Sequence, residues 1–208
     1  CSNQVTSREN FPRPIYAYYK DRNGNIWIGT KGGGLFINGT QYTREEKTNP
    51  IPSDDISDII SDSQGHIWVA TGGSGLLLMN YQKGKPLKFR QFLNRDINES
   101  RIQDLRCDLQ GRLWVGTFDG LFCLNTRQKK LSDKSFLHFS LTNHHLPAND
   151  VSCICTSPDG SIWIGTGGTG VIHCRLTGQK LTYRQFSTQQ GLSNNYIHSI
   201  ASDLKGGI

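Results

Sequence analysis

The sequence predicts an all-β fold assembled from repeated four-stranded antiparallel units, and three observations carry this prediction. A phrase with a central tryptophan recurs four times, and its tryptophans are Trp27, Trp68, Trp114 and Trp163. Stretches on either side of each tryptophan alternate apolar and polar residues, as half-buried strands do. Glycine-containing turns separate these stretches. Repeats of roughly 45 residues with four strands each are typical of the blades of a β-propeller.

The second unit shows the expected strands in order. Residues 56–62 alternate well enough for a half-buried strand, and residues 63–65 end in a glycine that suits a tight turn. Residues 66–71 are β-branched and aromatic, residues 72–75 form a second turn, and residues 76–79 are a third, apolar strand. Residues 88–92 fit an outer fourth strand. The position twelve residues before each tryptophan is also apolar, and these residues are Ile15, Ile56, Ile102 and Val151, with Ile197 in the same place of a fifth copy.

The residues that recur at fixed positions have structural explanations. Glycine supplies the positive φ that the first hairpin of each unit needs, and these residues are Gly24, Gly65, Gly111 and Gly160. An aspartate ahead of each turn can accept hydrogen bonds from the turn backbone, and these residues are Asp21, Asp62 and Asp108. We expect the four tryptophans to be large flat fillers between neighbouring blades.

The predicted domain is one partial propeller over residues 1–208. Its blades are expected at about residues 12–50, 51–96, 97–145 and 146–190, followed by the first strand of a fifth over 191–208. An open arc leaves the faces of its end blades uncovered, so the polypeptide is expected to continue past Ile208 and before Cys1. A swapped oligomer, or a ring completed by another chain, are the alternatives.

Composition narrows the function classes. The formal net charge is +6, and the basic residues concentrate in two clusters behind predicted third strands. Lysines that shield sheet edges from pairing are one interpretation, and a surface for an anionic ligand is the other. Nucleic acid is disfavoured because no recognition helix or aromatic-basic strand motif accompanies the charge. The clusters are Lys83, Lys85, Lys88, Arg90 and Arg95, and then Arg127, Lys129, Lys130 and Lys134.

No sequence pattern points to catalysis or to a cofactor. Zinc-protease, nucleophile-elbow, P-loop and dinucleotide motifs are all missing from the sequence. No apolar run reaches the roughly 18 residues needed to span a bilayer, so we expect no membrane contact by this segment. The cysteines form no Cys-x-x-Cys pair, and Cys107, Cys153 and Cys155 lie in apolar contexts that favour the core. We therefore predict no catalytic residue, no metal and no cofactor.

The units resemble the two-component regulator propeller repeat. Residues 190–203 match its lead-in and residues 159–171 match its core, while Ser157 in place of Asp and Ala70 in place of Gly depart from it. Residues 118–120 also lack one position of the repeat. The resemblance implies a seven-bladed ring in the periplasmic sensor region of a hybrid two-component system of Bacteroides type. It further implies an oligosaccharide ligand, with the histidine kinase elsewhere in the polypeptide.

Topology predicts a binding face. In a propeller, the loops that enter the innermost strands and the loops that join second and third strands gather at one end. Side chains there that could bond sugar hydroxyls, stack on a ring or pair with an acidic group form our candidate ligand site. The alternative is that its Asp and Asn residues only cap turns. The candidates are Asp55, Arg101, Asp150, Asn195, Lys31 and Phe118.

Two other function classes remain open at this stage. A protein-interaction or dimerisation scaffold is one, since repeat surfaces often bind proteins, and it includes a homodimer. An enzyme resembling streptogramin lyases is the other. It would need a histidine such as His173 or His198 to meet a carboxylate and a metal near the channel.

Overall fold

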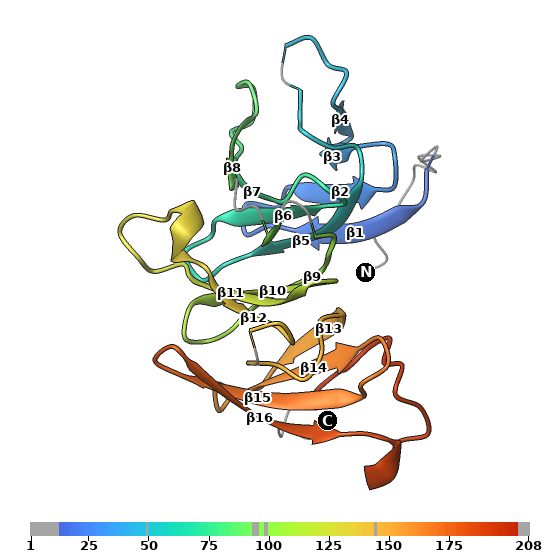
Figure 1. Cartoon of the computed structure of the whole chain (residues 1–208). Coiled ribbons are helices and arrows are strands. Elements are labelled where there is room, and N and C mark those ends of the chain that lie inside the picture. The colour runs from blue at the N-terminus through green and yellow to red at the C-terminus, as the bar shows by residue number, and fades with distance from the viewer. Residues whose placement is uncertain (1–12, 49, 93–95, 98–99, 144, 204–208) are drawn as a thin grey trace, which may run out of the picture.

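The computed structural model describes residues 13–48, 50–92, 96–97, 100–143 and 145–203. These residues form four antiparallel sheets of four strands, which follow one another in chain order (Figure 1). The predicted all-β propeller architecture is therefore confirmed. Blade 1 contains β1 (Ile15–Lys20), β2 (Ile26–Thr30), β3 (Leu35–Ile37) and β4 (Thr40–Tyr42), and blade 2 contains β5 (Ile56–Ser61), β6 (Ile67–Thr71), β7 (Leu76–Asn80) and β8 (Lys88–Phe92). Blade 3 contains β9 (Ile102–Cys107), β10 (Arg112–Thr117), β11 (Gly120–Asn125) and β12 (Leu137–Phe139), and blade 4 contains β13 (Val151–Thr156), β14 (Ile162–Thr166), β15 (Val171–Thr177) and β16 (Lys180–Phe186).

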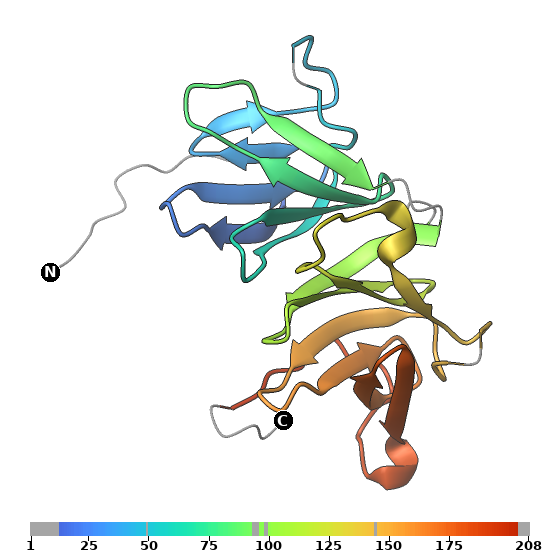
Figure 2. The same cartoon turned by 90° about the vertical axis from the view of Figure 1, so that its left-hand side faces the viewer.

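Each blade is a simple meander in which every strand pairs with the next one along the chain. The first strands β1, β5, β9 and β13 contact one another in succession and form the inner edge of the arc. The fourth strands form its outer edge, and Figure 2 shows the four blades fanning apart toward it. Two short 3₁₀ helices, η1 (Asp133–Ser135) and η2 (Thr188–Gln190), lie outside the sheets.

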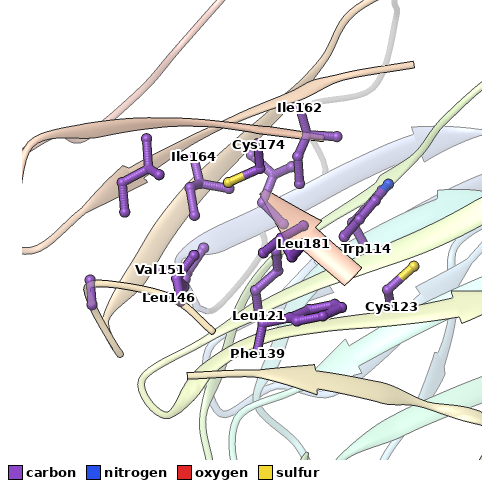
Figure 3. Close-up of a cluster of buried hydrophobic side chains, with 13 residues drawn as sticks. Trp114, Leu121, Cys123, Phe139, Leu146, Val151, Ile162, Ile164, Cys174 and Leu181 are labelled. Atoms are coloured by element: carbon purple, nitrogen blue, oxygen red, sulfur yellow. The ribbon is translucent and has the colours of Figure 1, made fainter. Parts of the chain in front are cut away.

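The core consists of three clusters of buried side chains, one at each junction between neighbouring blades. Figure 3 shows the junction of blades 3 and 4, where Trp114 of β10 meets Ile162 and Ile164 of β14. Trp27, Trp68 and Trp114 are fully buried. Trp163 in blade 4 is only half-buried, since no further blade covers it among the described residues.

The first hairpins of blades 1, 2 and 3 are each held by the aspartate that precedes them. In blade 3, Asp108 Oδ1 accepts the backbone N–H groups of Gln110 (3.0 Å) and Arg112 (2.9 Å). Its Oδ2 accepts Arg112 Nε (2.6 Å) and Trp114 Nε1 (2.8 Å). The same carboxylate-to-indole bond occurs in blade 1 (3.0 Å) and blade 2 (3.1 Å). The turn glycine of blade 3, Gly111, has φ +78°, which explains why a residue without Cβ stands there.

The contact between neighbouring blades depends on a second glycine, which lies two residues after the tryptophan in the same strand. A methyl group built on Gly29 would lie 2.6 Å from Ile56 Cγ2, and one on Gly116 would lie 2.8 Å from Val151 Cγ1. Ile56 and Val151 are the first residues of the next inner strands. The apolar position twelve residues before each tryptophan thus fills the space that the missing side chain leaves.

The cysteines in the apolar contexts lie where the sequence predicted. Cys153 and Cys155 are buried and Cys107 is half-buried, and all three are free thiols. Burial raises the pKa of the Cys107 thiol to about 12, so this group stays protonated and unreactive at neutral pH.

Residues 191–203, where the sequence predicts the start of a fifth blade, contain one isolated bridge from Tyr196 to Gly167 and no strand. Ile197 nevertheless donates its N–H to Thr166 O (3.0 Å), and Ser152 Oγ donates to Ile197 O (2.5 Å). The segment therefore lies against the inner edge of blade 4. Gly206 and the end of the predicted strand fall outside the described residues.

Candidate functional site at the loop end of the blades

Two sets of loops meet at one end of the blades, which we call the loop end. One set enters the inner strands, and the other joins the second strand of each blade to the third. In each blade a backbone N–H of the second set donates to a carbonyl of the first. The pairs are Lys31 to Pro14 (3.0 Å), Gly72 to Asp55 (2.9 Å), Phe118 to Arg101 (3.4 Å) and Gly167 to Asp150 (3.2 Å).

The loops are also tied from one blade to the next. Gly34 of blade 1 donates to Asp54 O ahead of blade 2 (2.8 Å), and Gly170 of blade 4 donates to Asn195 O (2.9 Å). Between blades 3 and 4, Gln103 Nε2 donates to Asp150 Oδ1 (2.8 Å). The two loop sets therefore lie together at the loop end, in agreement with the topological argument, and we call them the rim. Hydrogen bonds join the rim between blades 1 and 2 and between blades 3 and 4. Ligand contact by any residue of the rim stays a prediction.

Three of the six candidate residues are exposed at this rim. Phe118 is 45% exposed, and Arg101 and Lys31 are exposed as well. The Lys31 ammonium lies 6.0 Å from the centre of the Tyr16 ring, a weak cation–π distance that leaves the charge available to solvent. These three side chains could reach a ligand without any rearrangement of the blades.

The other three candidates are half-buried, and two of them have a structural use. Asp150 is bound by Gln103 as described, and Asn195 Oδ1 accepts the N–H of Thr188 (2.8 Å) beside η2. For these two residues the turn-capping alternative is the better supported one. Asp55 differs, because its side chain lines a cavity.

This cavity has a volume of about 310 Å³ and lies between blades 1 and 2 at the loop end. Its polar walls include Asp54, Asp55, Ser53, Ser74 and Arg44. A cavity of this size with several hydrogen-bonding side chains can accommodate one or two sugar rings.

Sequence reasoning missed Arg44, which follows the outer strand β4. Its backbone N–H donates to Asp54 Oδ1 (2.8 Å), which brings the segment after β4 back to the loop end. The signal was available, because a fourth antiparallel strand must finish at the same end at which the third begins. Sequence reasoning also missed the threonine hydroxyls that close the second turns, as in the bond from Thr71 Oγ1 to Gly75 O (2.7 Å).

A charged cluster joins the inner strands of blades 2, 3 and 4. Asp58 Oδ2 accepts Leu105 N (2.8 Å), and Asp104 Oδ2 accepts Ile154 N (2.6 Å). Arg106 Nη1 lies 2.7 Å from Asp104 Oδ1 and 3.6 Å from Asp58 Oδ2. Burial raises the pKa of Asp104 to about 7; the Arg106 charge opposes this shift and the nearby Asp58 charge adds to it. Asp104 therefore titrates near neutrality.

The histidines that an enzyme would need do not assemble a site. The His173 ring is stacked on Trp163 with its centroid 4.2 Å away, and burial lowers the pKa of its imidazole. His198 is exposed on residues 191–203. Within the described ranges, no three His, Cys, Asp or Glu side chains are placed to hold a metal ion.

Comparisons with known proteins establish the class of the repeats. The sequence profile of the two-component regulator propeller matches residues 11–32, 50–73 and 145–168, which cover the first two strands of blades 1, 2 and 4. These three segments are thus two-component regulator propeller repeats, and the resemblance seen in the sequence is confirmed. No curated protein matches the chain.

Solved structures agree with this assignment. The extracellular domain of a putative hybrid two-component system from B. thetaiotaomicron is 28% identical with a TM-score of 0.72, over 93% of this chain and 25% of that one. A second such domain from the same organism is 18% identical with a TM-score of 0.74, over 93% of this chain and 28% of that one. The chain therefore spans about a quarter of the length of the sensor domains that it matches.

Propeller enzymes are more distant. Virginiamycin B lyase from Staphylococcus aureus is 14% identical with a TM-score of 0.58, over 88% of this chain and 59% of that one, which is a likeness of fold alone. The family match and the sensor-domain neighbour identify the chain as a non-catalytic propeller segment. In the part of the chain that the structure describes, no helix is long and apolar enough to cross a membrane.

Proposed function

We propose that this chain is the ligand-sensing part of a periplasmic sensor in a hybrid two-component system, and that it responds to an oligosaccharide bound at the loop end. The observation that carries the proposal is the rim, which exposes Lys31, Arg101 and Phe118 at the same end of the blades as the 310 Å³ cavity. The extracellular location of the similar domain supports the placement outside the cytoplasm. The remaining blades of the same polypeptide are the proposed neighbours of the two open blade faces.

Calorimetric titration of the complete extracellular domain with neutral and acidic oligosaccharides tests the proposal. Phe118→Ala should weaken binding by about tenfold, the loss expected for one stacked ring. Lys129→Gln lies on the β11–η1 loop and serves as the matched surface control. Saturable binding that is indifferent to substitutions at Phe118, Arg101 and Asp55 would remove the loop end as the site.

A scaffold that binds protein is the second candidate, and one observation favours it. The inner strand of blade 1 exposes three large side chains, with Ile15 48%, Tyr16 47% and Tyr18 64% exposed. Large exposed apolar patches mark surfaces that another protein or blade covers. Self-association in sedimentation experiments, together with no heat from any saccharide, would favour this candidate over the sensor.

A further inference from the structure

A second cavity, larger than the one at the loop end, lies at the opposite end of blades 1 and 2. Its volume is about 740 Å³, within the usual range for small-molecule sites. Blade 1 contributes the turn between β1 and β2, and blade 2 contributes the segment between β7 and β8 together with β8 itself. We call this cavity the turn-end groove and define it by Arg22, Asn23, Asn80, Tyr81, Lys88 and Phe89.

Aromatic packing forms one wall of the groove. The Tyr81 ring meets the buried Trp27 indole edge-on, with centroids 5.5 Å apart. The Tyr81 hydroxyl accepts Asn38 Nδ2 of the β3–β4 turn (3.4 Å). Phe89 packs against the same apolar cluster from β8. The wall thus consists of rings fixed by the junction of the two blades, which is the surface on which sugar rings pack in proteins.

The groove presents unpaired positive charge. Asp21, its carboxylate on the blade 1 side, already accepts Asn23 N (2.9 Å), Asn25 N (2.8 Å) and Trp27 Nε1 (3.0 Å). By contrast, the side chains of Arg22 and Lys88 have no hydrogen bond or ion pair to any residue that the structure describes. The side-chain amides of Asn23 and Asn80 are equally without partners there. The groups left to meet a ligand are therefore two cations and two amides.

The surroundings reinforce this charge. Arg90 Nη1 of β8 donates to Leu131 O (2.9 Å), and Gln64 Nε2 donates to Thr126 O (2.8 Å). These bonds bring the second basic cluster, in the β11–η1 loop, next to the first. Two runs that are far apart in sequence thus form one basic surface beside the groove, which attracts anions. The loop-end cavity is lined instead by Asp54 and Asp55 with a single arginine, Arg44.

We propose that the turn-end groove binds an acidic oligosaccharide, a saccharide that carries carboxylate or sulfate groups. Arg22 and Lys88 pair with the acidic groups, Asn23 and Asn80 bond the hydroxyls, and the ring of Tyr81 packs on a sugar face. The site is separate from the loop end and is complete within blades 1 and 2. It therefore stands or falls independently of the oligosaccharide proposed for the loop end.

The test is titration of the protein with tetragalacturonate, with a sulfated chondroitin tetrasaccharide and with neutral cellotetraose. The variant is the pair Arg22→Gln and Lys88→Gln, and the matched control is the pair Lys47→Gln and Lys180→Gln, which line neither the groove nor the loop-end cavity. All four residues are exposed, so both variants should keep the wild-type urea midpoint. The groove pair should weaken at least one acidic probe about tenfold or more, and added salt should weaken it further. The control pair should leave that binding unchanged.

Three outcomes overturn the inference. Loss of acidic-probe binding in a Lys31→Gln and Arg101→Gln pair rather than in the groove pair would move the anionic contact to the loop end and support the proposed function. Failure of both acidic probes to bind would dismiss the groove site, while the titration with Phe118→Ala still decides the loop end. Equal competition by polyglutamate would show that the groove recognises acidic chains in general and not saccharides. A shift of the Trp27 indole N–H resonance by the acidic probe reports occupation of the groove directly and supports the assignment.

Discussion

Asp108→Ala should be among the most destabilising single substitutions in the first hairpins of the blades. The carboxylate accepts four hydrogen bonds, two from the turn backbone, one from Arg112 Nε and one from Trp114 Nε1. Trp114 is 0% exposed, so its indole N–H would be left buried without an acceptor. An orphaned buried donor costs about 1–3 kcal/mol, and an abandoned charged partner costs somewhat more. The expected loss is about 3–5 kcal/mol in the free energy of unfolding.

Asp108→Asn separates the hydrogen bonds from the turn backbone from those of the Arg112 and Trp114 side chains. Its carbonyl oxygen can still accept the two backbone N–H groups, whereas its amide would face Arg112 and Trp114 as another donor. The expected loss is therefore intermediate, about 1–3 kcal/mol. Asp119→Ala, an exposed carboxylate of the same blade, should stay within about 0.5 kcal/mol of the wild type.

Urea denaturation followed by tryptophan fluorescence measures these differences, and hydrogen exchange of the β10 amides locates them in blade 3. Blade 4 offers the reciprocal change, since Ser157 replaces the aspartate and its hydroxyl is buried without a partner among the described residues. Ser157→Asp should therefore stabilise blade 4 if the carboxylate is the holding group. A loss under about 1 kcal/mol for Asp108→Ala, or equal losses for the alanine and asparagine variants, would refute the account.

Two further predictions concern the inner edge of the arc. Burial raises the pKa of Asp104 in the folded state to about 7 from its ordinary value of 3.8. The folded state therefore binds more protons than the unfolded state between these pH values, and this residue's contribution to stability should fall as pH rises from about 4 to 7. Asp104→Asn should remove this pH dependence. The free energy of unfolding of the variant should therefore rise relative to that of the wild type from pH 5 to pH 8. A difference between the two that does not change with pH would contradict the raised pKa of Asp104. Gly116→Val should cost about 1–3 kcal/mol through overpacking against Val151, whose Cγ1 lies 2.8 Å from the added Cβ position. In a Val151→Ala background, which removes that Cγ1, the same substitution should cost less, and equal losses in both backgrounds would dismiss the packing explanation.

The strand order could be predicted from the sequence because the repeat fixes the position of every turn. The strands predicted for residues 76–79 and 88–92 of blade 2 occur at Leu76–Asn80 and Lys88–Phe92. Each repeat contains a turn glycine, a tryptophan strand and a second glycine turn, so the spacing of the repeats largely determines where each strand begins and ends. The repeat period does not predict the hydrogen bond from the indole N–H to the preceding aspartate. That bond depends on how far the side chain reaches across the hairpin, and spacing alone does not define the reach.

The binding face was predictable only at the level of topology. Antiparallel meanders place alternate loops at the same end, which is why the segments around Asp55 and Gly72 meet. Which loop side chains are free for a ligand is decided by local hydrogen bonds, and these leave Lys31 exposed but engage Asp150 and Asn195. The turn-end groove escaped prediction for a related reason. Its two cations, Arg22 and Lys88, come from different blades and converge only after the blades pack.

The glycine in the tryptophan strand explains why residues 191–203 contact blade 4 although they form no strand. In blades 1 and 3 the gap at Gly29 and Gly116 is filled by the first inner-strand residue of the following blade. At Gly165 the same gap is filled by Ile197, whose Cγ2 would lie 2.6 Å from an added Cβ. Ile197 therefore takes the place that opens an inner strand, in the register that the sequence repeat assigns to it. An inner strand also needs the second strand of its own blade as a pairing partner, and the described residues contain none for this segment. Ile197 is thus held against blade 4 by its packing on Gly165 and by hydrogen bonds to Thr166 and Ser152.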